Sequence, residues 1–304
     1  MPIQSEIRGY IEQIKSNRNQ GASELARQSL EVLKVAIAKS TAVTKPQFIL
    51  DINEISASLY SARPVMAPIK NVIKLFQKQL SANNSNDLNI TKKTAISIAD
   101  NIIKTSQEAV NKIAEYAKSV LTNNDVIMTQ SFSSTVAYAF KVASQNYKLN
   151  AIVTRSGTSK IGQITAQEIQ SYGVRVTYID DTAVGLYINQ VKKVFVGADR
   201  ICSDGILVNG VGTFLMALAA NKYQIPVYVL SESLKIDPNL KGNEADLEDK
   251  NPNEMVIQGV FKPEIIVKNP YFDITPVELI TALITEDGII PQSEISAYIQ
   301  KLAG

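Results

Sequence analysis

Regularly spaced apolar positions mark a long segment in the first half of the chain. The spacing alternates between three and four residues, through Ile96, Ala99, Ile103, Ser106, Val110, Ile113, Ala117 and Val120. This period places the positions on one face of a continuous α-helix. Thr91 or Thr94 is the expected N-cap, and Asn123–Asn124 is the expected end of the helix.

Shorter amphipathic patterns precede this helix, at about residues 3–14, 23–38 and 46–60. The polar stretch 81–89 separates two of the helical segments. Glycine is absent from residue 22 to residue 156. This absence suits helices, because an interior glycine weakens a helix by about 1 kcal/mol. We therefore expect an all-helical domain over residues 1–122.

From residue 125 onward, short β-type runs alternate with helical segments. The expected strands are Val126–Met128, Ala151–Thr154, Val174–Ile179, Lys193–Val196, Val227–Leu230 and Ile265–Val267. Helical segments lie between several of them, at about 134–146, 163–172 and 212–223. Strands that alternate with helices predict a parallel sheet. The expected fold class is α/β, with the helical domain followed by a Rossmann-like domain over residues 123–304.

The C-terminal region contains a pattern typical of a helix start. Thr275 precedes Pro276, which matches an N-cap followed by proline at the first helical position. Gly288 and Pro291 are typical of the exit from a helix. These signals predict a structural helix over residues 277–285.

Composition excludes several classes of chemistry. The 304 residues include no histidine and one cysteine, Cys202, so a disulfide framework within one chain, a Cys/His zinc site and a histidine-based triad are excluded. We expect no metal and no cofactor. A net charge of +2 does not favour nucleic-acid binding, and no apolar run is long enough for a membrane span. The single thiol and the absence of a signal-peptide pattern indicate a cytoplasmic protein.

Candidate chemistry lies where the expected strands end. Ligands of open α/β sheets bind at the carboxyl ends of strands, where Asp199 stands. The hydroxyl-rich segment 129–135 opens a helix and suits either a phosphate cradle or an ordinary N-cap. The loop 155–162, with Arg155, suits an anion, although a flexible polar loop is the favoured interpretation. Asp180–Asp181 fits a turn or cap better than a magnesium site.

The chain resembles a superfamily that contains the regulatory alpha, beta and delta subunits of eukaryotic translation initiation factor 2B. Methylthioribose-1-phosphate isomerase and archaeal ribose-1,5-bisphosphate isomerase belong to the same superfamily. The resemblance covers essentially the whole sequence and rests on motifs that are specific only in combination. These are Arg63–Pro64, Ile127–Thr129, Ser131–Ser133, Ile164–Ala166, Val176–Val184, Gly197–Arg200, Asn209 with Gly212–Thr213, Ser231–Ser233, Asn269–Pro276 and Thr285–Pro291.

The resemblance implies a helical domain, a Rossmann-like domain and dimers that build into larger oligomers. The isomerases resemble one another in a cysteine after the first Rossmann strand and in the aspartate of a Gly-Ala-Asp motif. Here the aspartate is Asp199, Ser131 stands at the cysteine position, and Gln130 stands where a histidine is common. Other side chains of the isomerases are replaced as well, at Gly157, Thr158, Ile161 and Gly210.

Two hypotheses follow. The first is a non-catalytic regulatory subunit that self-associates as a homodimer or higher homo-oligomer and binds initiation factor 2 through its helical domain. A residual pocket would then bind a sugar phosphate or nucleotide through Arg63, Ser131, Ser133, Arg155, Asp199 and Asn209. The alternative is a sugar-1-phosphate aldose–ketose isomerase in which Asp199 is the acid/base and Ser131 its weak partner, because a hydroxyl has a much higher pKa than a thiol.

Overall fold

The computed structural model describes residues 5–17, 20–157, 161–245, 247–256, 260–262 and 264–303. The chain divides into two compact units, Met1–Ala109 and Val110–Gly304. Each unit has its own buried apolar core. The two units are described separately below.

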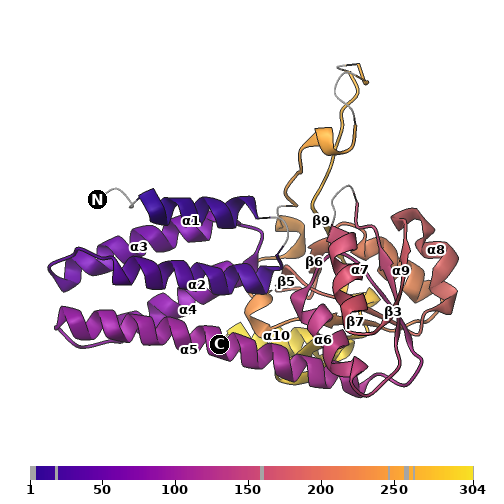
Figure 1. Cartoon of the computed structure of the whole chain (residues 1–304), viewed down its shortest axis with the longest axis horizontal. Coiled ribbons are helices and arrows are strands. Elements are labelled where there is room, and N and C mark those ends of the chain that lie inside the picture. Colours follow the sequence, from indigo (N-terminus) through magenta and orange to yellow (C-terminus); the bar gives the residue numbers. More distant parts are fainter. Residues whose placement is uncertain are drawn as a thin grey trace. The chain divides into compact units, whose positions relative to one another are not determined.

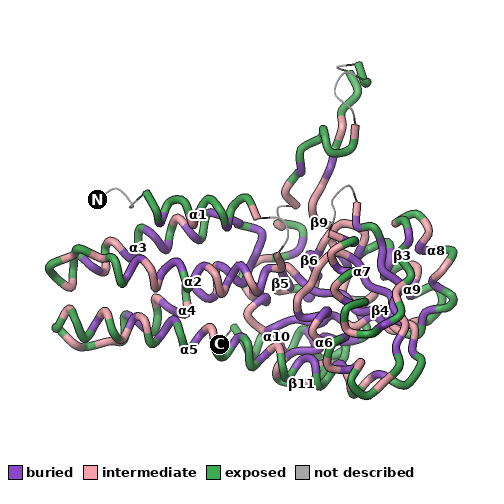
Figure 2. The backbone as a smooth tube through the Cα atoms, in the orientation of Figure 1, coloured by how far each residue is buried: buried purple, intermediate pink, exposed green. Residues whose placement is uncertain are grey.

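The described part of the first unit is helical, as the sequence predicted (Figure 1). Its helices are α1 (Ser5–Ser16), α2 (Ala22–Ala38), α3 (Lys45–Ala62), α4 (Ala67–Ser81) and the first part of α5 (Leu88–Ser119). Each helix turns one apolar stripe inward, which Figure 2 shows as alternating buried and exposed stretches along the tube. Large side chains are completely buried in the interior, among them Leu25, Leu30, Leu33, Phe48 and Phe76.

The long helix α5 is confirmed, but its predicted start is wrong. It begins at Leu88, before Thr91 and Thr94. The Asp87 carboxylate accepts a hydrogen bond from the Ile90 amide at 2.9 Å, so Asp87 is the N-cap. The helix ends at Ser119, a few residues before Asn124, whose φ of +67° is incompatible with its continuation.

A seven-stranded sheet forms the centre of the second unit. Its order is β11-β10-β7-β4-β1-β2-β3, and every neighbouring pair is parallel except β10 and β11. The strands are β1 (Val126–Thr129), β2 (Asn150–Thr154), β3 (Arg175–Ile179), β4 (Lys193–Val196), β7 (Val227–Leu230), β10 (Ala282–Thr285) and β11 (Gly288–Pro291). A mostly parallel sheet in an α/β unit confirms the predicted fold class.

Helices cover both faces of this sheet, because alternate strand residues point to opposite sides. Val194 and Val196 join one core with α9, while Phe195 between them joins the other core with α6. Phe195 also makes edge-to-face contacts with Phe140 and Tyr228, at 6.4 and 5.8 Å between ring centroids. The helices of this unit are α6 (Ser134–Ser144), α7 (Ile161–Ser171), α8 (Val184–Tyr187), α9 (Thr213–Lys222), α10 (Ile295–Ala303) and the end of α5.

A second, four-stranded sheet was not predicted. Its order is β8-β5-β6-β9, with β5 (Arg200–Cys202), β6 (Leu207–Gly210), β8 (Ile236–Asp237) and β9 (Phe272–Thr275). Strand β5 starts directly after Asp199, and β6 returns antiparallel to it after a turn at Gly205, whose φ is +78°. These strands are short, so their sequences carry little periodic signal. The second sheet fixes the backbone at Asp199 and directly after it.

Two predictions in the C-terminal region are wrong. The expected helix over 277–285 is a single 3₁₀ turn, Val277–Leu279, followed by β10. Pairing with β7 on one side and β11 on the other outweighs the local cap signal. The expected strand Ile265–Val267 is not a strand, and its apolar side chains at Ile265 and Ile266 are exposed.

Candidate functional site

The strand order places a crevice between β1 and β4. From β1 the chain adds β2 and β3 on one side, and then crosses over to add β4, β7 and β10 on the other. At such a switch point the loops that follow the two central strands diverge, and ligands of open α/β sheets bind there. The segments beginning at Gln130 and Gly197 occupy this place.

Ser131 is held in a strained conformation after β1. Its φ is +59°, a region that residues other than glycine rarely adopt. The Ser131 amide donates to Ser156 Oγ at 2.7 Å, and Thr165 Oγ1 donates to the Ser131 carbonyl at 2.6 Å. Ser156 also has a positive φ, +63°. Such strain costs about 1–3 kcal/mol and is typical of functional sites, so this loop is a candidate ligand contact.

Ser133 and Gly197 bring the ends of β1 and β4 together. Ser133 Oγ accepts a hydrogen bond from the Val136 amide at 3.3 Å, so it is the N-cap of α6. A Cβ atom at position 197 would lie 2.6 Å from Ser133 Oγ, which is too close, so this position requires glycine. Asp199 follows two residues later, half-buried, and its amide donates to the Val208 carbonyl of β6 at 3.0 Å.

Residues at the end of β6 lie against the Ser131 loop. A Cβ at Gly210 would lie 2.8 Å from Ser131 Oγ, so the serine hydroxyl points at this glycine. Gln130 Nε2 donates to the Gly210 carbonyl at 2.6 Å, and Asn209 Nδ2 donates to Thr213 Oγ1 at 3.0 Å. These contacts connect four sequence-predicted residues, which we call the strand-end site: Ser131, Ser133, Asp199 and Asn209.

The two predicted arginines make contacts outside the set of residues named above. Arg155 is 54% exposed at its side chain and lies 3.6 Å from Asp180. Arg63 belongs to the first unit, where it ends α3 and its Nη1 donates to the Asn17 carbonyl at 2.7 Å. Residues 158–160 of the predicted anion loop lie outside the described residues. A ligand role for either arginine therefore stays a prediction.

Two charged residues that were not predicted as ligand contacts border the strand-end site. The Asp181 carboxylate accepts hydrogen bonds from the amides of Ser156 and Gly157, at 2.8 and 2.7 Å. Its neighbour Asp180 accepts from the Thr182 amide at 3.0 Å, which supports the cap interpretation of this pair. Lys250 is buried with 6% exposure, its Nζ lies 4.6 Å from the centroid of the Tyr271 ring, and burial lowers its pKa. A long-range β-bridge between Asp249 and Pro270 positions Lys250, so no local signal predicts it.

A third missed residue, Asp273, caps α9 beside the site. Its Oδ2 accepts hydrogen bonds from the amides of Gly212 and Phe214, at 2.7 and 3.1 Å. Burial raises its pKa to about 6, against the opposing effect of these amides. Gly212 has a φ of +109°, so the turn into α9 depends on a glycine at this position.

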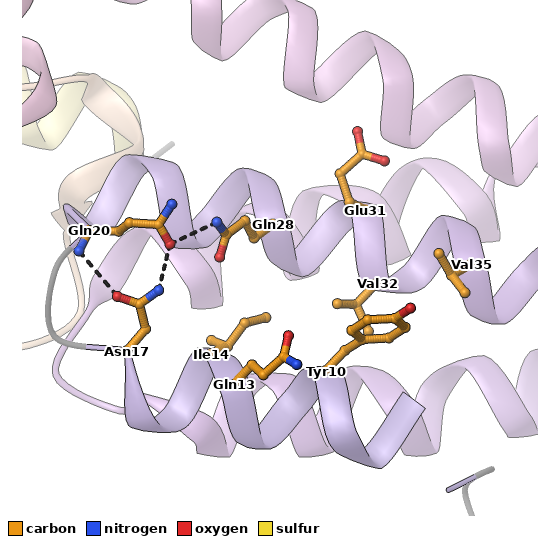
Figure 3. A pocket seen from close by; sticks show the side chains of 9 residues that line it. All are labelled: Tyr10, Gln13, Ile14, Asn17, Gln20, Gln28, Glu31, Val32 and Val35. Carbon is orange, nitrogen blue, oxygen red and sulfur yellow. Dashed lines mark hydrogen bonds between the residues drawn. The ribbon is translucent and has the colours of Figure 1, made fainter. Parts of the chain in front are cut away.

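A separate cavity of about 400 Å³ lies between α1 and α2 in the first unit (Figure 3). Four amide side chains line it, and three of them form a hydrogen-bonded cluster: Asn17, Gln20 and Gln28. Glu31 also lines the cavity, whereas no lysine or arginine does among the described residues. The Glu31 carboxylate pairs with Lys34 Nζ at 2.9 Å. Because the described lining itself offers a carboxylate and no cation, this cavity does not suit a phosphate.

Other kinds of site find no support in the described part of the chain. Its residues include no group of three or more His, Cys, Asp or Glu that could hold a metal ion. Cys202 is buried, and burial raises its pKa to about 12, so it carries no thiolate at neutral pH. No described helix combines the length and apolar character needed to cross a membrane.

The sequence matches the model of the Initiation factor 2 subunit family over residues 18–292. The chain belongs to this family. It is 33% identical over 296 residues to a ribose 1,5-bisphosphate isomerase of Pyrococcus furiosus, covering 95% of this chain and 91% of that protein. It is 30% identical to a putative translation initiation factor eIF-2B subunit 2-like protein of Pyrococcus abyssi, covering 92% of this chain and 94% of that protein.

Two solved structures share the fold. The translation initiation factor eIF-2B of Pyrococcus horikoshii OT3 has a TM-score of 0.81 and 27% identity, covering 95% of this chain and 98% of that chain. The 5-methylthioribose 1-phosphate isomerase of the same organism also has a TM-score of 0.81, at 24% identity, covering 98% and 87%. The predicted resemblance is therefore confirmed at the level of the family.

Proposed function

We propose that this protein binds a phosphorylated aldose at the strand-end site and converts it into the ketose phosphate, as an isomerase of the ribose 1,5-bisphosphate type. The observation that carries the proposal is Asp199 at the switch point of a chain 33% identical to such an isomerase. The comparisons favour this alternative over the regulatory subunit that was the first hypothesis, because three archaeal ribose 1,5-bisphosphate isomerases are 30–33% identical to this chain over 95–98% of its length.

The reaction requires proton transfer but no net oxidation. In ribose 1,5-bisphosphate the hydrogen on C2 moves to C1, and the C1–O4 bond of the ring breaks with its electrons remaining on O4. O2 loses its proton as C2 becomes a carbonyl, and O4 gains one. A carboxylate near both oxygens can take the first proton and deliver the second. Asp199 has this role in the proposal, and Ser131 and Asn209 orient the sugar hydroxyls.

The direct test is conversion of ribose 1,5-bisphosphate by the purified full chain, followed by ³¹P NMR. Methylthioribose 1-phosphate serves as the second substrate, because it lacks the 5-phosphate. Appearance of the ketose bisphosphate supports the proposal. If neither sugar is converted while both bind, the site binds ligand without catalysis.

Exchanging Ser131 for cysteine should raise turnover. A thiol has a pKa near 8.5, whereas a serine hydroxyl stays protonated at neutral pH. We expect kcat to increase on the order of tenfold or more in Ser131→Cys. Rate measurements on Ser131→Cys and on the control Ser134→Cys, at the start of α6, test this, and equal rates in both would contradict it.

We also propose that the chain self-associates through α9. Phe214, Leu215 and Leu218 of this helix are 37%, 56% and 41% exposed, although the helix is apolar on all sides. Helices of that kind are normally buried completely, so the open face favours a second copy. Sedimentation equilibrium that returns the mass of one chain at micromolar concentration would contradict this.

A non-catalytic regulator that binds initiation factor 2 is the second candidate. The observation that favours it is Ser131 itself, because neither a thiol nor a histidine lies at the end of β1. Its hydroxyl is a poor proton-transfer group. Binding of purified initiation factor 2 by a chain that converts neither sugar phosphate would support this candidate over the isomerase.

A further inference from the structure

Lys250 is a buried cation without a hydrogen-bond acceptor among the described residues. It is 6% exposed, and the contact of its ammonium is the face of Tyr271, with 4.6 Å between Nζ and the ring centroid. Burying a charged group without hydrogen bonds is costly, and an aromatic face offsets only part of that cost. The carboxylates of Asp181 and Glu254 also act electrostatically on the Lys250 ammonium. A bound anion would supply the hydrogen-bond acceptors that the ammonium lacks among the described residues.

The backbone around Lys250 is fixed, so its position is not that of a loose surface chain. The Lys250 amide donates to the Asn269 carbonyl at 2.7 Å, next to the bridge between Asp249 and Pro270. The Tyr271 carbonyl accepts a hydrogen bond from the Val211 amide at 2.9 Å. Lys250 and Tyr271 are therefore attached to the segment that begins with Gly210.

The ammonium also reaches the loop after β2. Lys250 Nζ lies 3.7 Å from the point where a Cβ on Gly157 would stand. Ser156, the preceding residue, accepts the hydrogen bond from the Ser131 amide at 2.7 Å. Gly210 lies against the Ser131 hydroxyl on the other side. The ammonium thus lies between two segments that both contact Ser131.

We propose that Lys250 binds a phosphate group of the phosphorylated sugar in the strand-end site. This inference rests on the proposed function and adds to it the group that recognises the anion. The amides of Ser156 and Gly157 are already bonded to Asp181, so they are not available to a phosphate. Gly210 carries no side chain, and Arg155 is exposed beside Asp180. Lys250 is one of three buried cations of this unit among the described residues, with Arg200 and Lys235, and it donates charge-assisted hydrogen bonds to the phosphate oxygens.

The test measures binding directly, independent of turnover. Isothermal titration with ribose 1,5-bisphosphate and with inorganic phosphate is carried out on the full chain and on Lys250→Met. We expect the dissociation constant of the sugar phosphate to rise about 10- to 100-fold, as for the loss of a charge-assisted hydrogen bond. Lys250→Arg, which keeps the charge, should remain within a few-fold of the wild type. Lys192→Met removes an exposed lysine of the same unit and should bind as the wild type does.

The outcomes separate this inference from the proposed function. Lys250-dependent binding in a chain that converts no sugar supports the inference and contradicts the isomerase. Unchanged affinity in a folded Lys250→Met shows a purely structural cation and overturns the inference. Lys250-dependent binding of inorganic phosphate alone, without the sugar phosphate, also overturns it. A measurement without variants is mass-spectrometric mapping of lysine acetylation, in which ribose 1,5-bisphosphate should protect Lys250 and should not protect Lys192.

Discussion

Asp199→Asn should lower the rate of ribose 1,5-bisphosphate conversion by about 10²- to 10⁴-fold, the usual contribution of a positioned acid/base. The amide has the size of the carboxylate but cannot take a proton from O2 or return one to O4. The backbone of Asp199 is fixed by β5 and by its bond to the Val208 carbonyl, so the substitution should leave the fold intact. Affinity for the sugar phosphate should change much less than kcat.

The matched control is Asp204→Asn. Asp204 is an exposed acid in the turn after β5, five residues along the chain, and its carboxylate accepts from the Gly242 amide at 3.1 Å. It should retain wild-type turnover. Initial rates followed by ³¹P NMR, together with melting temperatures, measure both effects. A folded Asp199→Asn variant with an undiminished rate would exclude Asp199 as the acid/base.

The stability of the protein should depend on pH through Asp273. Burial raises its pKa to about 6 in the folded chain, from an ordinary value of 3.8. Between these values the folded state holds a proton that the unfolded state releases. The stabilisation is therefore complete below about pH 4 and is lost as the pH rises through 6. At 1.36 kcal/mol per pKa unit, the loss amounts to about 3 kcal/mol.

Urea unfolding of the wild type and of Asp273→Asn at several pH values measures this effect. Asparagine keeps an oxygen that accepts from the Gly212 and Phe214 amides but does not titrate in this range. The free energy of unfolding of the wild type should fall by about 2–3 kcal/mol relative to the variant between pH 4 and pH 7. Parallel curves for the two proteins would show that Asp273 is not buried as a protonated acid.

Sequence patterns predicted the elements whose stability is decided locally. The seam of α5 repeats every three to four residues over several turns, and four members of the predicted set are buried: Ala99, Ser106, Ile113 and Ala117. The other four are half-buried, and the set missed the buried apolar residues Ala95, Ile98, Ile102, Ala109 and Ala114. The central strands β1, β2, β4 and β7 of the parallel sheet stand out because they are buried on both faces and are apolar along most of their length.

Errors arose where distant pairing decides the structure. Thr275–Pro276 has the local chemistry of a helix start, yet Ala282–Ile284 pairs with Tyr228–Leu230 and forms a strand. The β5–β6 hairpin is too short to give a periodic signal. Such elements become predictable only when the partner strand is known.

The residues of the candidate site also fall into two groups, those that the sequence predicts and those that only the fold brings to the site. Asp199 and Ser131 were found because strand ends are recognisable and because the chain resembles a known superfamily. Lys250 and Asp273 reach the same site through long-range contacts, with Gly157 and Gly212 respectively. No spacing in the sequence connects residues that lie about 60 to 90 positions apart. Physical signals for them, a buried ammonium and a buried carboxylate, exist only in the folded chain.

A crystal structure of the full chain with ribose 1,5-bisphosphate bound tests most directly whether the strand-end site binds the sugar phosphate. We expect the sugar between the Ser131 loop and Asp199, with one phosphate within hydrogen-bond distance of Lys250 Nζ. The same sugar phosphate bound away from the carboxyl ends of β1 and β4, or no ligand there at saturating concentration, would contradict the central claim.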